Sequence, residues 1–281
     1  MIKTNYHTHY SICDGKGEAE DYIRMALQKG FTALGFSSHA PVPFENPTNM
    51  EAKNLPVYLK TLQGLIKQYK EQLVIYLGLE IDFIHELTKP QKKLTTLPEL
   101  DYFIGSFHCM WSPKNSCYRE IDNTPEIFQA ILEEDFGGNI QAFVERYYQY
   151  IAELLETLNP PILGHFDLIK KNNPKEKYFK ESEAWYQKAV RTMYPILRKY
   201  EPIVEVNTGG LARGKTDSVY PSPWILYELR KENVPVMINS DAHTPEMLDA
   251  YVEEAIYLLK DVGYKKVWTL RREGWIAQSI S

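Results

Sequence analysis

The sequence predicts an α/β fold in which parallel strands close into a barrel. Two observations lead to this prediction. Short apolar runs alternate along the chain with longer segments of helical spacing. Two pairs of polar residues with the same spacing, His7 with His9 and Asp241 with His243, occur towards its two ends. The chain has 281 residues, 44% hydrophobic and 25% charged, a composition typical of globular proteins with a buried core.

Each predicted strand is a short run, rich in β-branched or aromatic residues, that ends in polar or ionisable residues. These runs are Ile2–Tyr6, Ala33–Phe36, Val74–Leu79, Tyr102–Ser106, Pro161–Gly164, Ile203–Val206 and Val234–Ile238. Repeated strand-helix units with right-handed crossovers make the strands parallel.

The predicted helices have apolar residues at helical spacing, and several end at glycine or proline. They are Glu18–Lys29, Leu55–Lys70, Ile140–Leu158, Ser182–Lys199, Ser222–Glu232 and Met247–Asp261. This alternation by itself allows either an open, doubly wound sheet or a closed barrel.

The pattern is not interrupted by an internal repeat or a flexible linker, so we expect a single domain over residues 1–281. The least regular stretch, residues 109–139, contains Pro113, Pro125, Gly137 and Gly138 among several acidic residues. We expect this stretch to be an insertion, either a lid over the site or a solvated acidic loop.

The charge and cysteine content exclude several classes of protein. The 32 Lys and Arg against 37 Asp and Glu give a net charge of −5, which argues against nucleic acid as a partner. Three cysteines are too few for a disulfide framework and favour a reducing compartment. Because no long apolar stretch predicts a signal peptide or a membrane span, we expect a cytoplasmic protein that does not bind membranes.

Six of the seven histidines lie at or just after the end of a predicted strand. They are His7, His9, His39, His108, His165 and His243. The carboxyl ends of parallel strands share one edge, so we expect these six imidazoles to converge there. The seventh, His85, precedes a helical pattern, and we expect it at the surface or at a helix cap.

Two pairs of site residues favour a closed barrel. His7 and His9 are two residues apart, so on a strand their side chains point to the same face. Asp241 and His243 repeat this spacing near the other end of the chain. Closure of the sheet would make the first and last strands neighbours and bring the two pairs together.

Three acids occupy equivalent places at strand ends or in the loops that follow: Asp14, Glu80 and Asp241. Imidazole and carboxylate groups are the ligands of divalent ions such as Zn, Mn and Fe. Nine such ligands are too many for one ion and suit a cluster of two or three. With three acids against three divalent ions the site would be cationic, which suits a phosphate ester.

These segments resemble the motifs of the PHP (polymerase and histidinol phosphatase) family of metal-dependent phosphoesterases. NYHTHYSICDG is similar to the first motif, FSSHAP to the second and GLEIDF to the third, followed by GSFHCM, GHFDLIKK and INSDAH. The resemblance extends from about His7 to about His243 and is strongest to the single-domain histidinol-phosphatase branch. It implies a distorted (β/α)7 barrel.

The resemblance also implies how the ligands are shared among the ions. One metal would be held by His7, His9, Glu80 and Asp241. A second would be held by Glu80, His108 and His165, and a third by Asp14, His39 and His243. Glu80 would then bridge the first two ions, and Asp14 stands where some members of the family have histidine.

The reaction that we expect is hydrolysis of a small phosphate monoester. Water between two divalent ions ionises near neutral pH, and the resulting hydroxide would attack phosphorus. The side chains that would hold it are His7, His9, Glu80, His108, His165 and Asp241. We expect Arg213 to clamp the phosphate, although it could also be a solvated loop residue. Lys215 and Lys170 are further candidates for phosphate contacts.

Within the histidinol-phosphatase branch, the implied substrate is L-histidinol phosphate, an intermediate of histidine biosynthesis. Acidic residues of the 109–139 stretch would receive its ammonium and imidazole groups. One alternative is a PHP phosphoesterase for another small phosphate ester or nucleotide. A metal-dependent amidohydrolase fits Glu80 and the Asp241 and His243 pair less well. A non-catalytic, metal-stabilised binding module would be expected to have lost some of the nine ligands.

Overall fold

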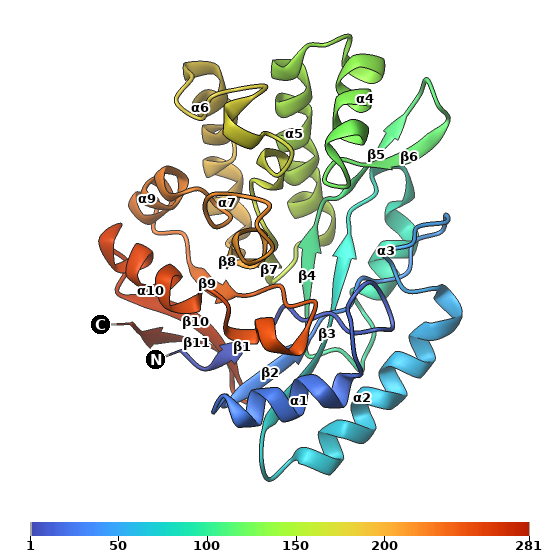
Figure 1. Cartoon of the computed structure of the whole chain (residues 1–281), viewed down its shortest axis with the longest axis vertical. Coiled ribbons are helices and arrows are strands. Elements are labelled where there is room, and N and C mark those ends of the chain that lie inside the picture. The colour runs from blue at the N-terminus through green and yellow to red at the C-terminus, as the bar shows by residue number, and fades with distance from the viewer. Residues whose placement is uncertain (1, 281) are drawn as a thin grey trace.

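The structure is a computed structural model that describes residues 2–280, and its central element is a sheet of seven parallel strands (Figure 1). In sheet order the strands are β1 (Thr4–Asn5), β2 (Ala33–Phe36), β3 (Val74–Asp82), β4 (Tyr102–Ser106), β7 (Ile162–Leu163), β8 (Ile203–Asn207) and β9 (Val236–Asn239). Each strand runs parallel to its neighbours, so the predicted strands and their parallel arrangement are confirmed.

The sheet closes through the residues that follow β1 and β9. Thr8 and Ala242 form a single parallel bridge there. The amide of Ser240 donates a hydrogen bond to Oδ1 of Asn5 at 2.9 Å, so a side chain replaces part of the missing backbone ladder. The sheet is therefore closed, as the spacing of the two residue pairs predicts, and it forms the distorted barrel that the family resemblance implies.

Helices cover the outside of the barrel (Figure 1). They are α1 (Ala19–Gln28), α2 (Leu55–Tyr69), α3 (Thr88–Leu94), α4 (Pro125–Phe136), α5 (Ile140–Leu158), α6 (Ala184–Arg191), α7 (Tyr194–Tyr200), α8 (Gly209–Ala212), α9 (Pro223–Lys231) and α10 (Val252–Asp261). Short 3-10 segments are η1 (Ala52–Asn54), η2 (His85–Leu87), η3 (Leu168–Lys170), η4 (Pro174–Glu176) and η5 (Pro245–Asp249). None of the helices within residues 2–280 combines the length and apolar character needed to cross a membrane.

Two predicted helices are broken in the structure. The helix expected over Ser182–Lys199 is divided into α6 and α7. Pro195 causes this break, because proline lacks an amide hydrogen and its ring would clash with the carbonyl four residues earlier. The helix expected over Met247–Asp261 is divided into η5 and α10 at Ala250, which is extended, and Tyr251, which has a φ of 56°.

Two antiparallel hairpins lie outside the main sheet and were not predicted. One consists of β5 (Cys109–Ser112) and β6 (Cys117–Glu120), the other of β10 (Lys266–Arg271) and β11 (Gly274–Ser279). In Figure 1 the β5–β6 hairpin projects from the body of the molecule beside α4.

Residues 109–139 are regular rather than irregular, because the β5–β6 hairpin is followed by α4. The side chain of Thr124 accepts a hydrogen bond from the amide of Ile127 and caps the amino end of α4. Pro125 starts the helix, and Gly137 ends it with a φ of 59°. The proline and glycines that suggested a loop are therefore helix boundary signals.

Aromatic side chains fill the interior of the barrel. The hydroxyl of Tyr102 donates to the carbonyl of Tyr6 at 2.5 Å. A side chain at Gly78 would place its Cβ only 2.5 Å from Cζ of Tyr102, so this position requires glycine. Leu270 and Trp275 of the β10–β11 hairpin join the same cluster. Because the interior is packed, the site lies at the edge of the strands rather than in a pore.

Candidate metal centre

All nine predicted ligands come together at the carboxyl-terminal edge of the barrel strands. Overlapping groups of their ring nitrogens and carboxylate oxygens lie within 4.8 Å of one another. The nine residues are His7, His9, Asp14, His39, Glu80, His108, His165, Asp241 and His243. All except Asp14 and His243 are buried. The strand-end position of the histidines, which is visible in the sequence, is thus sufficient to place the site.

The carboxylate of Glu80 lies at the centre of the cluster. Its Oε2 is 3.1 Å from Nε2 of His7 and 3.1 Å from Nδ1 of His39. The same oxygen is 3.4 Å from Nε2 of His9. The other oxygen, Oε1, is 2.9 Å from Nε2 of His165. Since its two oxygens face different histidines, Glu80 has the geometry of a bridging ligand.

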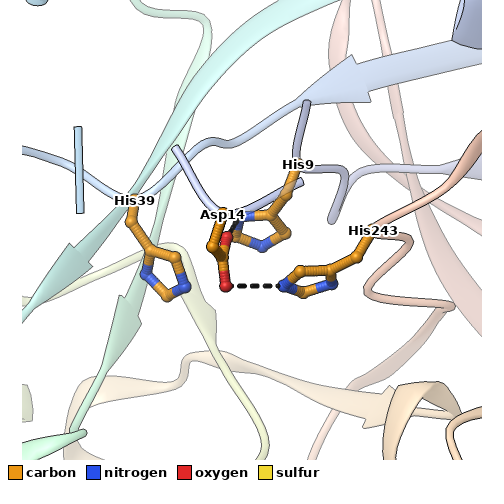
Figure 2. A group of neighbouring side chains, drawn as sticks. All are labelled: His9, Asp14, His39 and His243. Carbon is orange, nitrogen blue, oxygen red and sulfur yellow. Dashed lines mark hydrogen bonds and ion pairs between the residues drawn. The ribbon is translucent and has the colours of Figure 1, made fainter. Parts of the chain in front are cut away.

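A second part of the cluster surrounds Asp14 (Figure 2). The imidazoles of His9, His39 and His243 converge on its carboxylate, and Oδ2 of Asp14 is 3.1 Å from Nε2 of His243. His9 faces both parts of the cluster, because its Nε2 is also 3.3 Å from Oδ1 of Asp241. His9 could therefore belong to either of two groups of metal ligands, whereas the family motifs place it in one.

Several buried ring nitrogens in the cluster lack hydrogen-bond partners. Nε2 of His7, Nε2 of His9 and Nδ1 of His39 make no hydrogen bond of acceptable geometry with any group in residues 2–280. A buried polar atom without a partner is unfavourable, and such atoms need an explanation. These nitrogens face carboxylates at a common centre, and imidazole with carboxylate is a donor set that suits divalent metal ions. The residues therefore fit such ions.

Burial and neighbouring charges shift the pKa values of His7 and His9 in opposite directions. Burial disfavours the charged form of His7, but the carboxylates of Glu205 and Glu80 outweigh it and raise the pKa of His7 well above its usual value. Burial, together with the nearby rings of His243 and His39, lowers the pKa of His9 to about 4. His9 is thus held as the neutral imidazole, the form that binds metal.

Two further acids orient ligating histidines by contacting the ring nitrogen that does not face Glu80. Oε1 of Glu205 lies 2.6 Å from Nδ1 of His7, and its Oε2 accepts the amide of His165 at 3.0 Å. Asp82 pairs in the same way with Nδ1 of His108. Sequence analysis missed Glu205, although a charged residue inside the apolar run of β8 was a usable signal. Asp82 shares the strand face of Glu80, two residues away.

We predict that Glu205→Gln weakens metal binding by about 10- to 100-fold, the usual effect of removing a carboxylate that orients a ligating histidine. Glutamine keeps the size of the side chain but removes the charge beside Nδ1 of His7. Metal content after dialysis against a graded metal buffer measures this effect. An affinity equal to that of the wild type would contradict the role of Glu205, and excess metal is expected to restore most of the activity.

A cavity of about 310 Å³ opens beside the cluster, and its wall carries cationic side chains. Arg213 and Lys215, two of the residues expected to contact phosphate, both line it. The Arg213 guanidinium donates to Oδ2 of Asp241 at 2.8 Å and to the carbonyl of Asp241 at 2.7 Å. Burial disfavours the charge on Arg213, but Asp241 raises the pKa of this guanidinium above its usual value. Arg213 is therefore a fixed cation at the edge of the site rather than a solvated loop residue.

The structure does not bring Lys170 to the cavity. Its Nζ is buried and donates to the carbonyl of Val219 at 2.8 Å and to Oγ of Ser222 at 2.5 Å. The carboxylate of Asp167 lies 3.1 Å away. The next residue, Lys171, lines the cavity instead. The sequence did not show which of the two lysines reaches the cavity, because both lie at the end of a 3-10 segment whose side-chain directions the sequence pattern does not reveal.

The fold and site define a class of protein, a parallel seven-stranded barrel with a histidine and carboxylate cluster for divalent metal ions at its carboxyl-terminal edge. The model of the PHP domain matches residues 4–209, and the chain belongs to this family. A histidinol-phosphatase of Bacillus subtilis is 29% identical over 265 residues, which cover 86% of this chain and 94% of the relative.

The solved structures include one with nearly the whole of this fold. It is the histidinol phosphate phosphatase of Lactococcus lactis, complexed with zinc, L-histidinol and phosphate. The TM-score is 0.76 at 19% sequence identity, and the match covers 98% of this chain and 100% of the other. This likeness confirms the distorted (β/α)7 barrel that the resemblance of the motifs implies.

Proposed function

We propose that this protein is a metal-dependent phosphomonoesterase that converts L-histidinol phosphate to L-histidinol and phosphate, a step of histidine biosynthesis. The observation that carries the proposal is the buried cluster of nine ligands, which opens into a small cavity beside Arg213. Family membership supports the chemistry, and the histidinol-phosphatases among the relatives support the substrate. A biosynthetic enzyme with this composition would act in the cytoplasm on a small molecule, away from nucleic acid and membranes.

The proposed ligand sets follow the contacts in the cluster. One divalent ion would be held by His7, His9, Glu80 and Asp241. A second would be held by Glu80, His108 and His165, and a third by Asp14, His39 and His243. Zn, Mn and Fe all accept this mixture of imidazole and carboxylate.

Divalent ions in these sites would activate water and neutralise negative charge on the phosphoryl oxygens. The chain itself then has three tasks. Glu205 and Asp82 hold His7 and His108 in fixed orientations. Arg213 gives the phosphate a planar, positively charged partner, and a guanidinium can bind two phosphoryl oxygens at once. The cavity limits the size of the substrate.

The wall of the cavity at Glu120 suits a cationic organic group. Glu120 of β6 lines it, and its Oε1 accepts hydrogen bonds from Asn46 at 2.9 Å and from Thr48 at 2.8 Å. Asn123 donates to its other oxygen at 2.6 Å. A carboxylate fixed in this way would attract the ammonium and imidazole of histidinol. We therefore propose that the 109–139 segment is an insertion, within a single domain, that forms part of the substrate site.

We expect Arg213→Ala to raise KM for a phosphate monoester by about 10-fold, since a charged hydrogen bond contributes roughly 1.4 kcal/mol or more. Steady-state kinetics with L-histidinol phosphate measures the change. Arg213 also pairs with Asp241, so metal content is determined for the same preparation. An unchanged KM in a fully metallated variant would exclude the phosphate contact.

A comparison of substrates tests the proposed function directly. We expect kcat/KM for L-histidinol phosphate to exceed that for a sugar phosphate or a nucleoside monophosphate by about 100-fold or more, because only the first has a cation for Glu120. A preference for another ester would assign the same chemistry to a different pathway. The absence of turnover with every ester and metal would favour a non-catalytic binding module.

A further inference from the structure

Lys171 and Asp122 form an ion pair in the wall of the cavity. Nζ of Lys171 lies 2.7 Å from Oδ2 of Asp122, and both side chains line the space beside the metal ligands. The side chain of Lys171 is 21% exposed, so its ammonium can be reached from the cavity. Neither residue has a role in the ligand sets or in the phosphate contact assigned to Arg213.

This ion pair is fixed from both sides. Asn172, the next residue after Lys171, donates its side-chain amide to the carbonyl of Ile121 at 3.1 Å and is buried. On the other side, the buried ammonium of Lys170 anchors the chain. The loop after β7 and the segment after β6 are thereby joined, and the ammonium of Lys171 is held at one place in the cavity wall.

The pair faces a different part of the cluster from Arg213. Arg213 contacts Asp241 and His243, which follow β9. Asp122 instead follows Ile121, whose amide donates to the carbonyl of His108 at 2.8 Å, and Lys171 lies in the loop after β7 that also carries His165. Burial disfavours the charge on Asp122, but the ammonium of Lys171 and the ring of His108 lower its pKa to about 2. The carboxylate therefore stays charged and keeps the ammonium in place.

Hydrolysis of an alkyl phosphate also requires stabilisation of the leaving oxygen. Neither Arg213 nor the metal ligands have been assigned this role. When the bond between phosphorus and the ester oxygen breaks, the leaving oxygen takes the electron pair and becomes a strongly basic alkoxide. General acid catalysis at such a step contributes typically about 10²- to 10⁴-fold to the rate. A fixed ammonium in the cavity wall, with partners different from those of Arg213, is a suitable proton donor.

We propose that Lys171, held by Asp122, is the catalytic acid that protonates the leaving alcohol, an inference that rests on the proposed phosphomonoesterase function. A water oxygen bonds to phosphorus as the ester bond breaks, and that water releases one proton to solvent. Lys171 transfers a proton to the leaving alkoxide, and the neutral amine recovers a proton from solvent. The products are the alcohol and hydrogen phosphate, so atoms and charge balance.

Dependence on the leaving group tests this role. We compare the wild type with Lys171→Met on L-histidinol phosphate, whose alkoxide needs a proton, and on p-nitrophenyl phosphate, whose phenolate leaves without one. We expect kcat for the alkyl ester to fall by about 100-fold or more and kcat for the aryl ester to change by less than about 3-fold. Loss of a purely structural ion pair would lower both rates by the same factor, and this result would overturn the proposal.

Two further variants complete the experiment. Lys171→Arg keeps the positive charge and the partner Asp122, but its guanidinium does not give up a proton. We expect this variant to fold normally and still to show the selective loss on the alkyl ester, so a wild-type rate would contradict proton transfer. Lys177→Met removes an ammonium from the same loop at an exposed position that pairs with Tyr178, and we expect both rates to be unchanged.

The outcomes separate this inference from the proposed function. If the wild type hydrolyses both esters and Lys215→Met, not Lys171→Met, shows the selective loss, the acid is assigned wrongly and the phosphomonoesterase remains. If the wild type hydrolyses neither ester with any added metal, both proposals fail. Metal content and melting temperature, measured for each variant, show that a lost rate is not a lost cluster or a lost fold.

Discussion

The variant His9→Ala is expected to lose phosphate release by roughly 1000-fold or more, because it removes a ligand that faces two parts of the metal cluster. Nε2 of His9 is 3.4 Å from Glu80 and 3.3 Å from Asp241, while its Nδ1 is 3.7 Å from Asp14. Alanine can supply none of these contacts. Phosphate release at saturating substrate and metal content per protein measure the effect, and circular dichroism shows that the fold is kept.

The matched control for His9→Ala is His85→Ala. The side chain of His85 is 46% exposed, as expected from the sequence, pairs with Glu153 and belongs to none of the ligand groups. We expect His85→Ala to keep full activity and metal content. A folded His9→Ala protein that retained both would contradict the assignment of His9 as a ligand.

The second large effect is expected for Glu80→Gln, which keeps the shape of the central side chain and removes its charge. Burial disfavours the Glu80 carboxylate, but His39, His7 and other neighbouring rings hold its pKa well below the usual value. Glutamine cannot bridge two cations, so we expect loss of at least one bound ion and a decrease in kcat of roughly 1000-fold or more. Elemental analysis and steady-state kinetics measure the two changes.

Glu86→Gln is the control for this second variant, because Glu86 is an exposed acid in η2, the short 3-10 segment that follows β3. It is expected to behave as the wild type. Full occupancy of every ion in Glu80→Gln would show that Glu80 does not bridge, even if activity were lost.

The barrel could be predicted because each of its strands has a clear local pattern and a chemical marker at its end. His7 and Asp241 lie at opposite ends of the sequence, yet their spacing to His9 and His243 indicated that the sheet closes. The structure closes it through Thr8 and the strand ends rather than through a full ladder. Such a closure depends on long-range side-chain contacts that a local pattern does not contain.

Elements outside the barrel were harder to predict. The β5–β6 hairpin is partly exposed and mixes polar with apolar residues, so it lacks the apolar run of a buried strand. Pro125 and Gly137 were interpreted as loop residues because either meaning fits the same residue types. Only the capping contact of Thr124 shows that they are the ends of α4.

In the site, the nine ligands could be predicted from residue type and position, but the groups around them could not. Glu205 orients His7 across the barrel from a strand far along the chain. Lys171 rather than Lys170 reaches the cavity because Lys170 is directed to Val219 and Ser222. Both facts depend on the tertiary structure, in which neighbouring residues of one short segment face different surroundings.

The most direct test of the central claim is phosphate release from L-histidinol phosphate by the purified protein, with a nucleoside monophosphate as the competing ester. The measurement is made before chelation, after chelation, and after Mn or Zn is restored. We predict turnover that is lost with the chelator, returns with metal and strongly favours L-histidinol phosphate. Turnover that persists in fully metal-free protein, or no turnover with any metal, would contradict the metal-dependent phosphomonoesterase that the nine-ligand cluster supports.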